Sequence, residues 1–245
     1  MKIKIQMAFI GLLLSIILGC GGGGGGSDPL LVTSINAKAV TDFNYNFDET
    51  SGSTATNSAD NYYNGTIYGA SRVIGKVGNA LHFGSPGAKV EIPMYIYGIP
   101  FKTNTVSIDA WINLDTITPG QISQIVGDGD SGLTCFRFLI SNGKLVFLLS
   151  DGSAFRTVIT GNQTLLANTW YHVAITYNGT TATTYINGTV DNTNNITFPI
   201  VDFENSIFIA CANSLYQFYG TIDELRISKS LRSSADINSY YQMTK

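Results

Sequence analysis

The sequence is poor in charged residues, which occupy 13% of its 245 positions, about half the share found in ordinary soluble proteins. It holds 14 lysines and arginines against 17 aspartates and glutamates, so its net charge is −3. No basic surface for phosphate groups is indicated, and this composition argues against nucleic-acid binding. The 44% of hydrophobic residues argues equally against a disordered chain.

Histidine is also scarce, and this limits the catalytic chemistry that the chain can support. His82 and His172 are the only histidines, and no Gly-x-Ser-x-Gly turn accompanies either of them. A Ser-His-Asp arrangement needs a nucleophile, a base and an orienting acid within hydrogen-bond reach. Both histidines lie in segments that alternate as strands do, so we expect structural roles for them.

The N-terminal apolar run is short. It covers residues 7–18, too few for a helix across ~30 Å of hydrocarbon, and it follows Lys2 and Lys4 as the core of a signal peptide does. The residues Ile17-Leu18-Gly19-Cys20 resemble a bacterial lipobox. We therefore expect a lipoprotein signal peptide at 1–19 and a lipidated Cys20. The alternative is an ordinary signal peptide with a chance cysteine.

A glycine run separates this leader from the rest of the chain. Residues 21–26 are all glycine and Ser27 follows, which is typical of a flexible tether. We expect the lipidated cysteine and its linker at 20–40 and one folded domain at 41–245. Acyl chains on Cys20 would attach the protein to a membrane, so the expected location is the bacterial cell envelope, at the outer membrane or the cell surface.

Beyond the linker, short β-type runs alternate with tight turns. Asn142-Gly143 and Asn187-Gly188 supply the positive φ angles of type I′ hairpins. No amphipathic segments of about 10–15 residues alternate with these runs, so a parallel α/β fold is excluded. A dozen short strands at this spacing predict two antiparallel sheets packed as a sandwich. The expected strands are 43–47, 80–83, 89–92, 106–112, 122–126, 136–140, 144–149, 156–159, 171–177, 181–186, 206–210 and 220–227.

The C-terminal segment has a different pattern. Ser233-Ser234-Ala235-Asp236 resembles a capping box, and Ile237, Tyr240 and Tyr241 follow at the spacing of one helix face. A short helix at 234–241 is therefore expected.

Six sequence blocks carry a family resemblance. They are FDETSG at 47–52, NGT at 64–66, GKVGNALHF at 75–83, VSIDAWI at 106–112, WYHVA at 170–174 and GTIDELRI at 220–227. In this order they resemble the laminin-G-like jelly roll of concanavalin A-like architecture, from Phe43 to Tyr241. The resemblance implies an all-β fold, namely a two-sheet antiparallel jelly-roll sandwich with a short C-terminal helix.

The resemblance also implies a structural Ca²⁺ ion. Members of the family often bind Ca²⁺ through an aspartate that corresponds to Asp223 of this chain. Main-chain oxygens, at positions that correspond to the region of Asp48 and to Gly78, complete the site. Calcium takes six to eight oxygen ligands, which carbonyls and one or two carboxylates can supply. The alternative is that Asp223 only caps a strand end through backbone hydrogen bonds.

The expected function is binding without turnover. Related jelly-roll glucanases carry Glu-x-Asp-x-Glu on one strand, because retaining hydrolysis needs two carboxylates about 5 Å apart, and this chain has no such triplet. We therefore expect a lipid-anchored surface module that binds a glycan or an extracellular protein. A jelly-roll lyase or glycosidase with a dispersed site and a structural envelope protein are the alternatives.

Acidic and aromatic residues in or beside predicted loops are the candidate ligand contacts. Asp128 and Asp130 belong to a glycine-rich loop, and solvation at a hairpin tip is their alternative role. Tyrosine rings can stack on the apolar faces of sugars, or else pack over the ends of the sandwich. The tyrosines concerned are Tyr62, Tyr63 and Tyr216, with Tyr95, Tyr97 and Tyr219 in similar positions.

Two cysteines remain after lipidation. Cys135 and Cys211 lie at the ends of predicted strands of an exported protein, where oxidation is possible. A disulfide between them and two buried thiols are equally consistent with the sequence.

Overall fold

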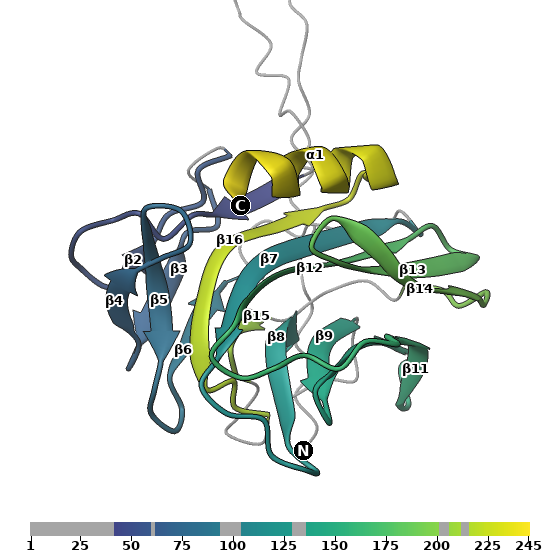
Figure 1. The fold of residues 1–245 in the computed structure, drawn as a ribbon, viewed down its shortest axis with the longest axis horizontal. Coiled ribbons are helices and arrows are strands. Elements are labelled where there is room, and N and C mark those ends of the chain that lie inside the picture. Colours follow the sequence, from purple (N-terminus) through teal and green to yellow (C-terminus); the bar gives the residue numbers. More distant parts are fainter. Residues whose placement is uncertain (1–41, 60–61, 94–103, 129–135, 201–205, 212–215) are drawn as a thin grey trace, which may run out of the picture. The chain divides into compact units, whose positions relative to one another are not determined.

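Two antiparallel sheets of eight strands each pack face to face, and one helix lies on the outside (Figure 1). The computed structural model describes residues 42–245 except 60–61, 94–103, 129–135, 201–205 and 212–215. All described residues belong to the compact unit Lys38–Lys245. The expected signal peptide at 1–19, Cys20 and the linker at 20–40 lie outside the described residues. The all-β sandwich with a short C-terminal helix is confirmed.

The first sheet joins strands that are distant in sequence. Its order is β14-β13-β12-β7-β16-β5-β4, and β1 also pairs with β16. The last strand, β16, lies between β7 and β5, so that Gly220 is opposite both Leu114 and Phe83. The strands are β1 (Asp42–Tyr45), β4 (Ser71–Ile74), β5 (Asn79–Phe83), β7 (Val106–Leu114), β12 (Trp170–Tyr177), β13 (Thr181–Ile186), β14 (Thr189–Asn195) and β16 (Gly220–Ser228).

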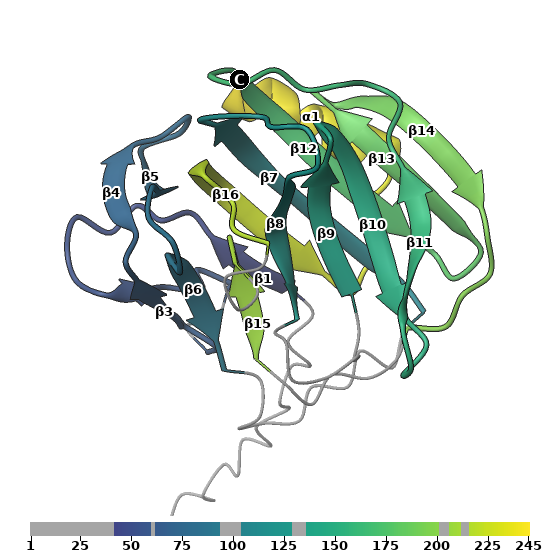
Figure 2. The same ribbon diagram turned by 90° about the horizontal axis from the view of Figure 1, so that it is seen from below.

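The second sheet has the order β11-β10-β9-β8-β15-β6-β3-β2, and Figure 2 shows it in front of the first. Its middle is a run of antiparallel pairs from β8 to β11, in which Asn142-Gly143 joins β9 to β10 as predicted. The strands are β2 (Thr54–Ala55), β3 (Gly65–Tyr68), β6 (Lys89–Ile92), β8 (Ile122–Asp128), β9 (Phe136–Ser141), β10 (Lys144–Ser150), β11 (Phe155–Thr160) and β15 (Ile207–Ile209).

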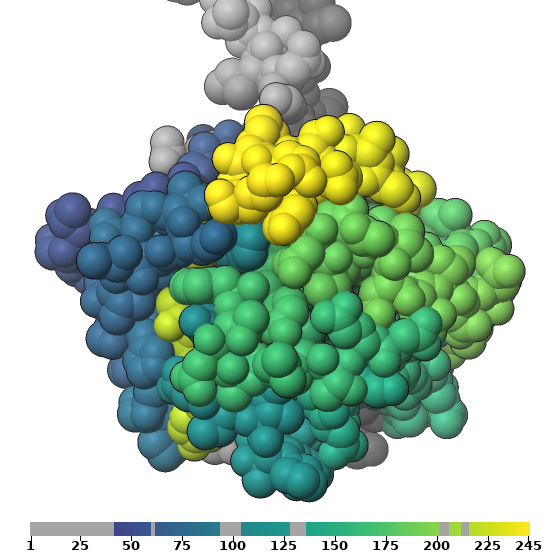
Figure 3. All heavy atoms as spheres, viewed as in Figure 1, coloured from purple at the N-terminus to yellow at the C-terminus, as the bar shows by residue number. Residues whose placement is uncertain are grey.

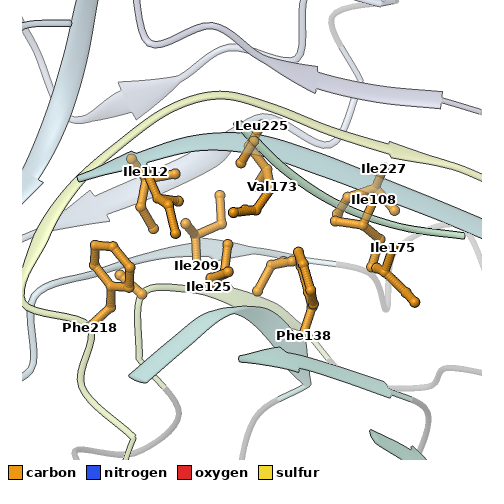
Figure 4. Packing of buried hydrophobic residues seen from close by; sticks show 14 of the residues in the cluster. Ile108, Ile112, Ile125, Phe138, Val173, Ile175, Ile209, Phe218, Leu225 and Ile227 are labelled. Atoms are coloured by element: carbon orange, nitrogen blue, oxygen red, sulfur yellow. The ribbon is translucent and has the colours of Figure 1, made fainter. Parts of the chain in front are cut away.

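The core lies between the sheets, where alternate side chains of both point inward (Figure 4). Each large apolar side chain buried there contributes about 1.5–3 kcal/mol to stability. The first sheet supplies Ile108, Ile112, Val173, Ile175, Leu225 and Ile227, and the second supplies Ile125, Phe138 and Ile209.

All twelve expected strands are present, with ends shifted by at most two residues. Four further strands, β2, β3, β4 and β14, were not expected. β2 has only two residues, and β14 has no buried residue at all, so neither shows the alternation from which strands are predicted.

The helix α1 (Ser234–Thr244) covers the outer face of the first sheet. Its predicted capping box is confirmed: Ser233 Oγ accepts a bond from Asp236 N at 3.1 Å, and Asp236 Oδ2 accepts one from Ser233 N at 3.0 Å. Ile237 is fully buried, and Asn238 donates to Gly188 O at the β13–β14 turn, where Figure 3 shows α1 in contact with the green surface. No helix in the described part of the chain is long and apolar enough to cross a membrane.

A buried ionic cluster joins the segment before α1 to the first sheet. Asp109 on β7 is fully buried and accepts bonds from His172 Nε2 at 3.1 Å, from Arg226 Nε at 3.0 Å and from Arg232. Burial alone would raise the pKa of Asp109, but the hydrogen bond from His172 and the two guanidinium groups hold it below its ordinary value. His172 therefore has the structural role expected of it.

Side-chain amides connect the two sheets along one lateral edge of the sandwich, where the edge strands β14 and β11 lie. Asn192 and Asn194 on β14 donate to Thr160 O at 2.8 Å and to Val158 O at 2.7 Å, both on β11. The spacing of two residues on each strand imitates a β-ladder between the edges of the two sheets. We call this contact the amide seam.

Candidate functional site

A groove of about 440 Å³ lies where two segments meet at one end of the sandwich. One segment follows β7 and leads into β8, and the other precedes β16. The volume falls in the range usual for small-molecule sites. The lining residues are Thr116, Thr118, Gly120, Gln121, Ile122, Tyr216, Gln217 and Tyr219.

Backbone hydrogen bonds hold the two walls of the groove together. Asp115 N donates to Tyr219 O at 3.1 Å, and Gln124 N donates to Tyr216 O at 2.8 Å. These bonds lie at the two ends of the 216–219 segment, so its position against the β7–β8 connection is fixed at both ends.

Gln217 forms the floor of the groove. It is only 6% exposed, its Oε1 accepts a bond from Gly87 N at 2.8 Å, and its Nε2 donates to Ala88 O and Phe218 O at 3.1 and 2.9 Å. The carboxamide is thus occupied within the protein. Because Gln217 and Phe218 point inward, Tyr216 and Tyr219 on either side of them remain partly exposed.

Arg137 supports the ring of Tyr216. Its guanidinium carbon lies 5.0 Å from the centroid of the Tyr216 ring and 4.2 Å from that of the Phe155 ring, the geometry of cation–π contacts. Arg137 is only 8% exposed and is not among the lining residues of the groove.

Three polar groups of the lining are available to a ligand. The hydroxyls of Thr116 and Thr118 and the carboxamide oxygen of Gln121 have no hydrogen-bond partner among the residues that the structure describes. Together with two partly exposed tyrosine rings, they offer hydrogen bonds beside flat apolar surfaces.

A second location gathers the residues expected to bind calcium. Asp223 Oδ2 accepts bonds from Lys76 N at 2.8 Å and Val77 N at 2.9 Å, within the turn that joins β4 to β5. In the same turn, Gly78 has φ +59°, and a Cβ there would lie 2.1 Å from Asp48 Oδ1. Asp48, Gly78 and Asp223 therefore meet around one turn.

The carboxylate of Asp223 is buried, and only one of its two oxygens accepts described hydrogen bonds. Its Oδ1 is buried and has no described hydrogen-bond partner. Burial raises the pKa of Asp223 to about 7, the bond from Val77 N opposes this rise, and the charge of Glu224 adds to it. An unpartnered buried oxygen near further carboxylates fits a cation. No cluster of three or more metal-binding side chains occurs among the described residues, so backbone oxygens would have to complete such a site.

The other expected contacts lie apart from the groove or outside the described residues. Tyr62 is 59% exposed. Tyr63 is 9% exposed and its ring lies 5.6 Å from that of Phe43, so Tyr63 packs against the protein, the alternative role given for these tyrosines. Asp128 ends β8. Cys211 is buried. Asp130, Cys135, Tyr95 and Tyr97 lie outside the described residues.

Most of the groove could not be predicted from the sequence. Tyr216 and Tyr219 are the lining residues that the sequence indicated, because an aromatic ring beside a predicted loop is a recognisable signal. Thr116, Thr118 and Gln121 are ordinary turn residues, and no signal distinguished them from the many other threonines and amides of the chain. His82 is bonded to Asp115 at 3.0 Å, next to the groove.

Comparisons with known proteins place the chain among jelly-roll folds. The family model Laminin_G_3, described as the concanavalin A-like lectin/glucanases superfamily, matches residues 84–238, more than half of the chain. Among solved structures, domain 4 of AbnA, a GH43 extracellular arabinanase from Geobacillus stearothermophilus in complex with arabinotriose, is 20% identical with a TM-score of 0.64. That match covers 82% of this chain and 97% of that domain.

Two toxin structures are similar in the same way. The binding domain of Paraclostridial Mosquitocidal Protein 1 is 16% identical with a TM-score of 0.63, covering 82% of this chain and 51% of that one. The binding domain of botulinum neurotoxin DC in complex with SialylT is 16% identical with a TM-score of 0.62, covering 83% and 51%. The chain thus spans about half the length of these toxin chains. No match was found among curated proteins.

Proposed function

Because the chain belongs to the concanavalin A-like lectin/glucanases superfamily, as its sequence blocks predicted, we propose that it is a non-catalytic glycan-binding module. The observation that carries the proposal is the groove, in which two partly exposed tyrosine rings stand beside free hydroxyl and amide groups. The arabinotriose in the AbnA domain and the naming of both toxin structures as binding domains are in keeping with it.

The groove suits a sugar because a sugar ring has both apolar faces and hydroxyl edges. The faces would stack on Tyr216 and Tyr219, whose flat rings bury much surface at little cost in side-chain entropy. The edges would bond to Thr116, Thr118 and Gln121. No Asp or Glu belongs to the described lining, so the groove lacks the pair of carboxylates that retaining hydrolysis uses.

A glycan array probed with the purified full-length chain tests this proposal. Binding of at least one glycan is expected, and the Tyr216→Ala/Tyr219→Ala double variant should lose it while keeping the wild-type circular dichroism spectrum. Tyr62→Ala, which removes an exposed tyrosine elsewhere, is the control. A release of reducing ends or unsaturated sugars from any bound glycan would instead favour the lyase or glycosidase alternative.

We propose further that Asp223 binds a structural Ca²⁺ ion through Oδ1, with oxygens of the segment at Asp48 and of the turn at Gly78. The ion would supply a positive charge where buried and neighbouring carboxylates otherwise repel one another. Asp223 Oδ2 would continue to hold the backbone of the β4–β5 turn.

The proposed location is the bacterial cell envelope, with Cys20 as the lipidated N-terminus. Support for this comes from the lipobox-like residues and the glycine run that follows them. A tether of this kind would let the module reach ligands near the surface that carries it.

A further inference from the structure

The described lining of the groove carries no charge, and this deepens the proposed function, on which the inference rests. The lining residues are tyrosines, threonines, glutamines, a glycine and an isoleucine. Both segments are also uncharged in sequence beyond the lining itself, from Thr116 to Gln124 and from Ala210 to Gly220. We infer that the groove selects neutral saccharides and discriminates against those that carry carboxylates or sulfates.

Two charged residues beside the groove also disfavour an acidic ligand. Asp115, next to Thr116, is 45% exposed in its side chain and bonded to His82, so a carboxylate already stands at the groove. Arg137 contacts a lining residue, Tyr216, but it is only 8% exposed and stacks on the rings of Tyr216 and Phe155. An acidic sugar would meet a negative neighbour and would have no exposed cation on the described lining.

The physical cost of an acidic ligand follows from these surroundings. A carboxylate that leaves water without gaining an ion pair or charged hydrogen-bond donors loses solvation that nothing replaces. A neutral sugar gives up only hydroxyl hydration, which Thr116, Thr118 and Gln121 can restore. Neutral ligands should also bind independently of ionic strength, since salt screens only interactions between charges.

Matched pairs of sugars test this inference on the full-length chain. Isothermal titration would compare lactose with sialyllactose, and a galactan trisaccharide with trigalacturonate. The neutral member of at least one pair is expected to bind about tenfold more tightly, with no change between about 0.01 and 0.15 M salt. Tyr216→Ala should weaken that binding about tenfold, whereas Tyr216→Phe, which keeps the ring, should retain it.

A gained charge provides the converse test. Thr118→Lys adds a cation to the lining, so its affinity for the acidic member of each pair should rise and become sensitive to salt. Ser153→Lys adds the same charge on an exposed turn outside the groove. It should change neither the affinity for the acidic sugars nor the dependence of that affinity on salt. Both variants lie at exposed positions and are expected to fold as the wild type does.

The possible failures can be told apart. Absence of binding to any glycan overturns the proposed function and the inference together. Tighter binding of the acidic members, weakened by Tyr216→Ala, overturns the inference and leaves the glycan-binding function standing. Neutral binding that Tyr216→Ala does not affect also overturns it, because the ligand then lies elsewhere on the protein.

Discussion

At the scale of single residues, both the backbone conformation at position 78 and the nearby Asp48 side chain require a glycine there. Its φ of +59° is left-handed, and an added Cβ would lie 2.1 Å from Asp48 Oδ1, which accepts a bond from Asn79 N. Gly78→Ala should therefore lower the free energy of unfolding by about 2 kcal/mol or more, through backbone strain and displacement of Asp48.

Gly152 provides the matched control for this substitution. Its φ is +85°, and nothing lies within 4 Å of the position that a Cβ would take, so Gly152→Ala adds only conformational strain, about 1 kcal/mol. Urea denaturation of both variants compares the two losses. Equal losses would mean that Asp48 moves aside without cost.

Asp223 determines the expected response to calcium. If Ca²⁺ binds only the folded protein, an ion concentration of a hundred times Kd adds about 2.7 kcal/mol and raises Tm by roughly 5–10 °C. Asp223→Asn keeps the shape of the side chain but removes its charge, so the variant should lose most of this shift. Thermal melts with calcium and with chelator measure it.

The control for this experiment is Asp115→Asn, which removes a surface carboxylate and should keep the full response. A wild-type Tm that chelator does not change, in protein that elemental analysis shows to be free of metal, would mean that Asp223 only holds the β4–β5 turn.

At the scale of secondary-structure elements, the ionic cluster at Asp109 holds the segment before α1 against the first sheet. Asp109→Asn leaves Arg226 and Arg232 largely buried without their carboxylate, so unfolding should become easier by about 3 kcal/mol at neutral pH. Asp115→Asn, at a partly exposed pair, should cost about 1 kcal/mol or less.

The pH dependence of this effect has a definite sign. Because the pKa of Asp109 is lower in the folded protein, its stabilising contribution is complete above the unfolded value of about 3.9 and is lost as the pH falls through the folded value. The difference in unfolding free energy between wild type and Asp109→Asn should thus shrink below about pH 4. A difference that stays constant down to acid unfolding would contradict this account.

Elements with a strong internal pattern could be predicted, and the others depend on their partners. β12 alternates between core and outer-face residues, and the capping box at Ser233 marks the start of α1. β14, with the sequence TVDNTNN, has no buried face and becomes a strand because β13 pairs with it. The groove could not be predicted, because it forms only when β16 lies beside β7 and brings Tyr219 to Asp115.

At the scale of the whole molecule, we predict that lipidation of Cys20 determines where the protein resides. Cys20→Ala should leave an unprocessed precursor without lipid, because the acyl chains are attached to the cysteine thiol. Metabolic labelling with a fatty acid and fractionation of the membranes measure this. The control is Cys211→Ala, which should be processed normally; processing and lipid label in the Cys20 variant would contradict the prediction.

The amide seam has a consequence for proteins held close together in one plane. Sheet edges with unused carbonyls are templates for pairing with a neighbouring chain. On β11, the carbonyls of Val158 and Thr160 already accept bonds from the side chains of Asn194 and Asn192. If copies of the module are anchored close together on one surface, as proposed, these two carbonyls are not available to a neighbouring strand, which disfavours strand-to-strand pairing along β11.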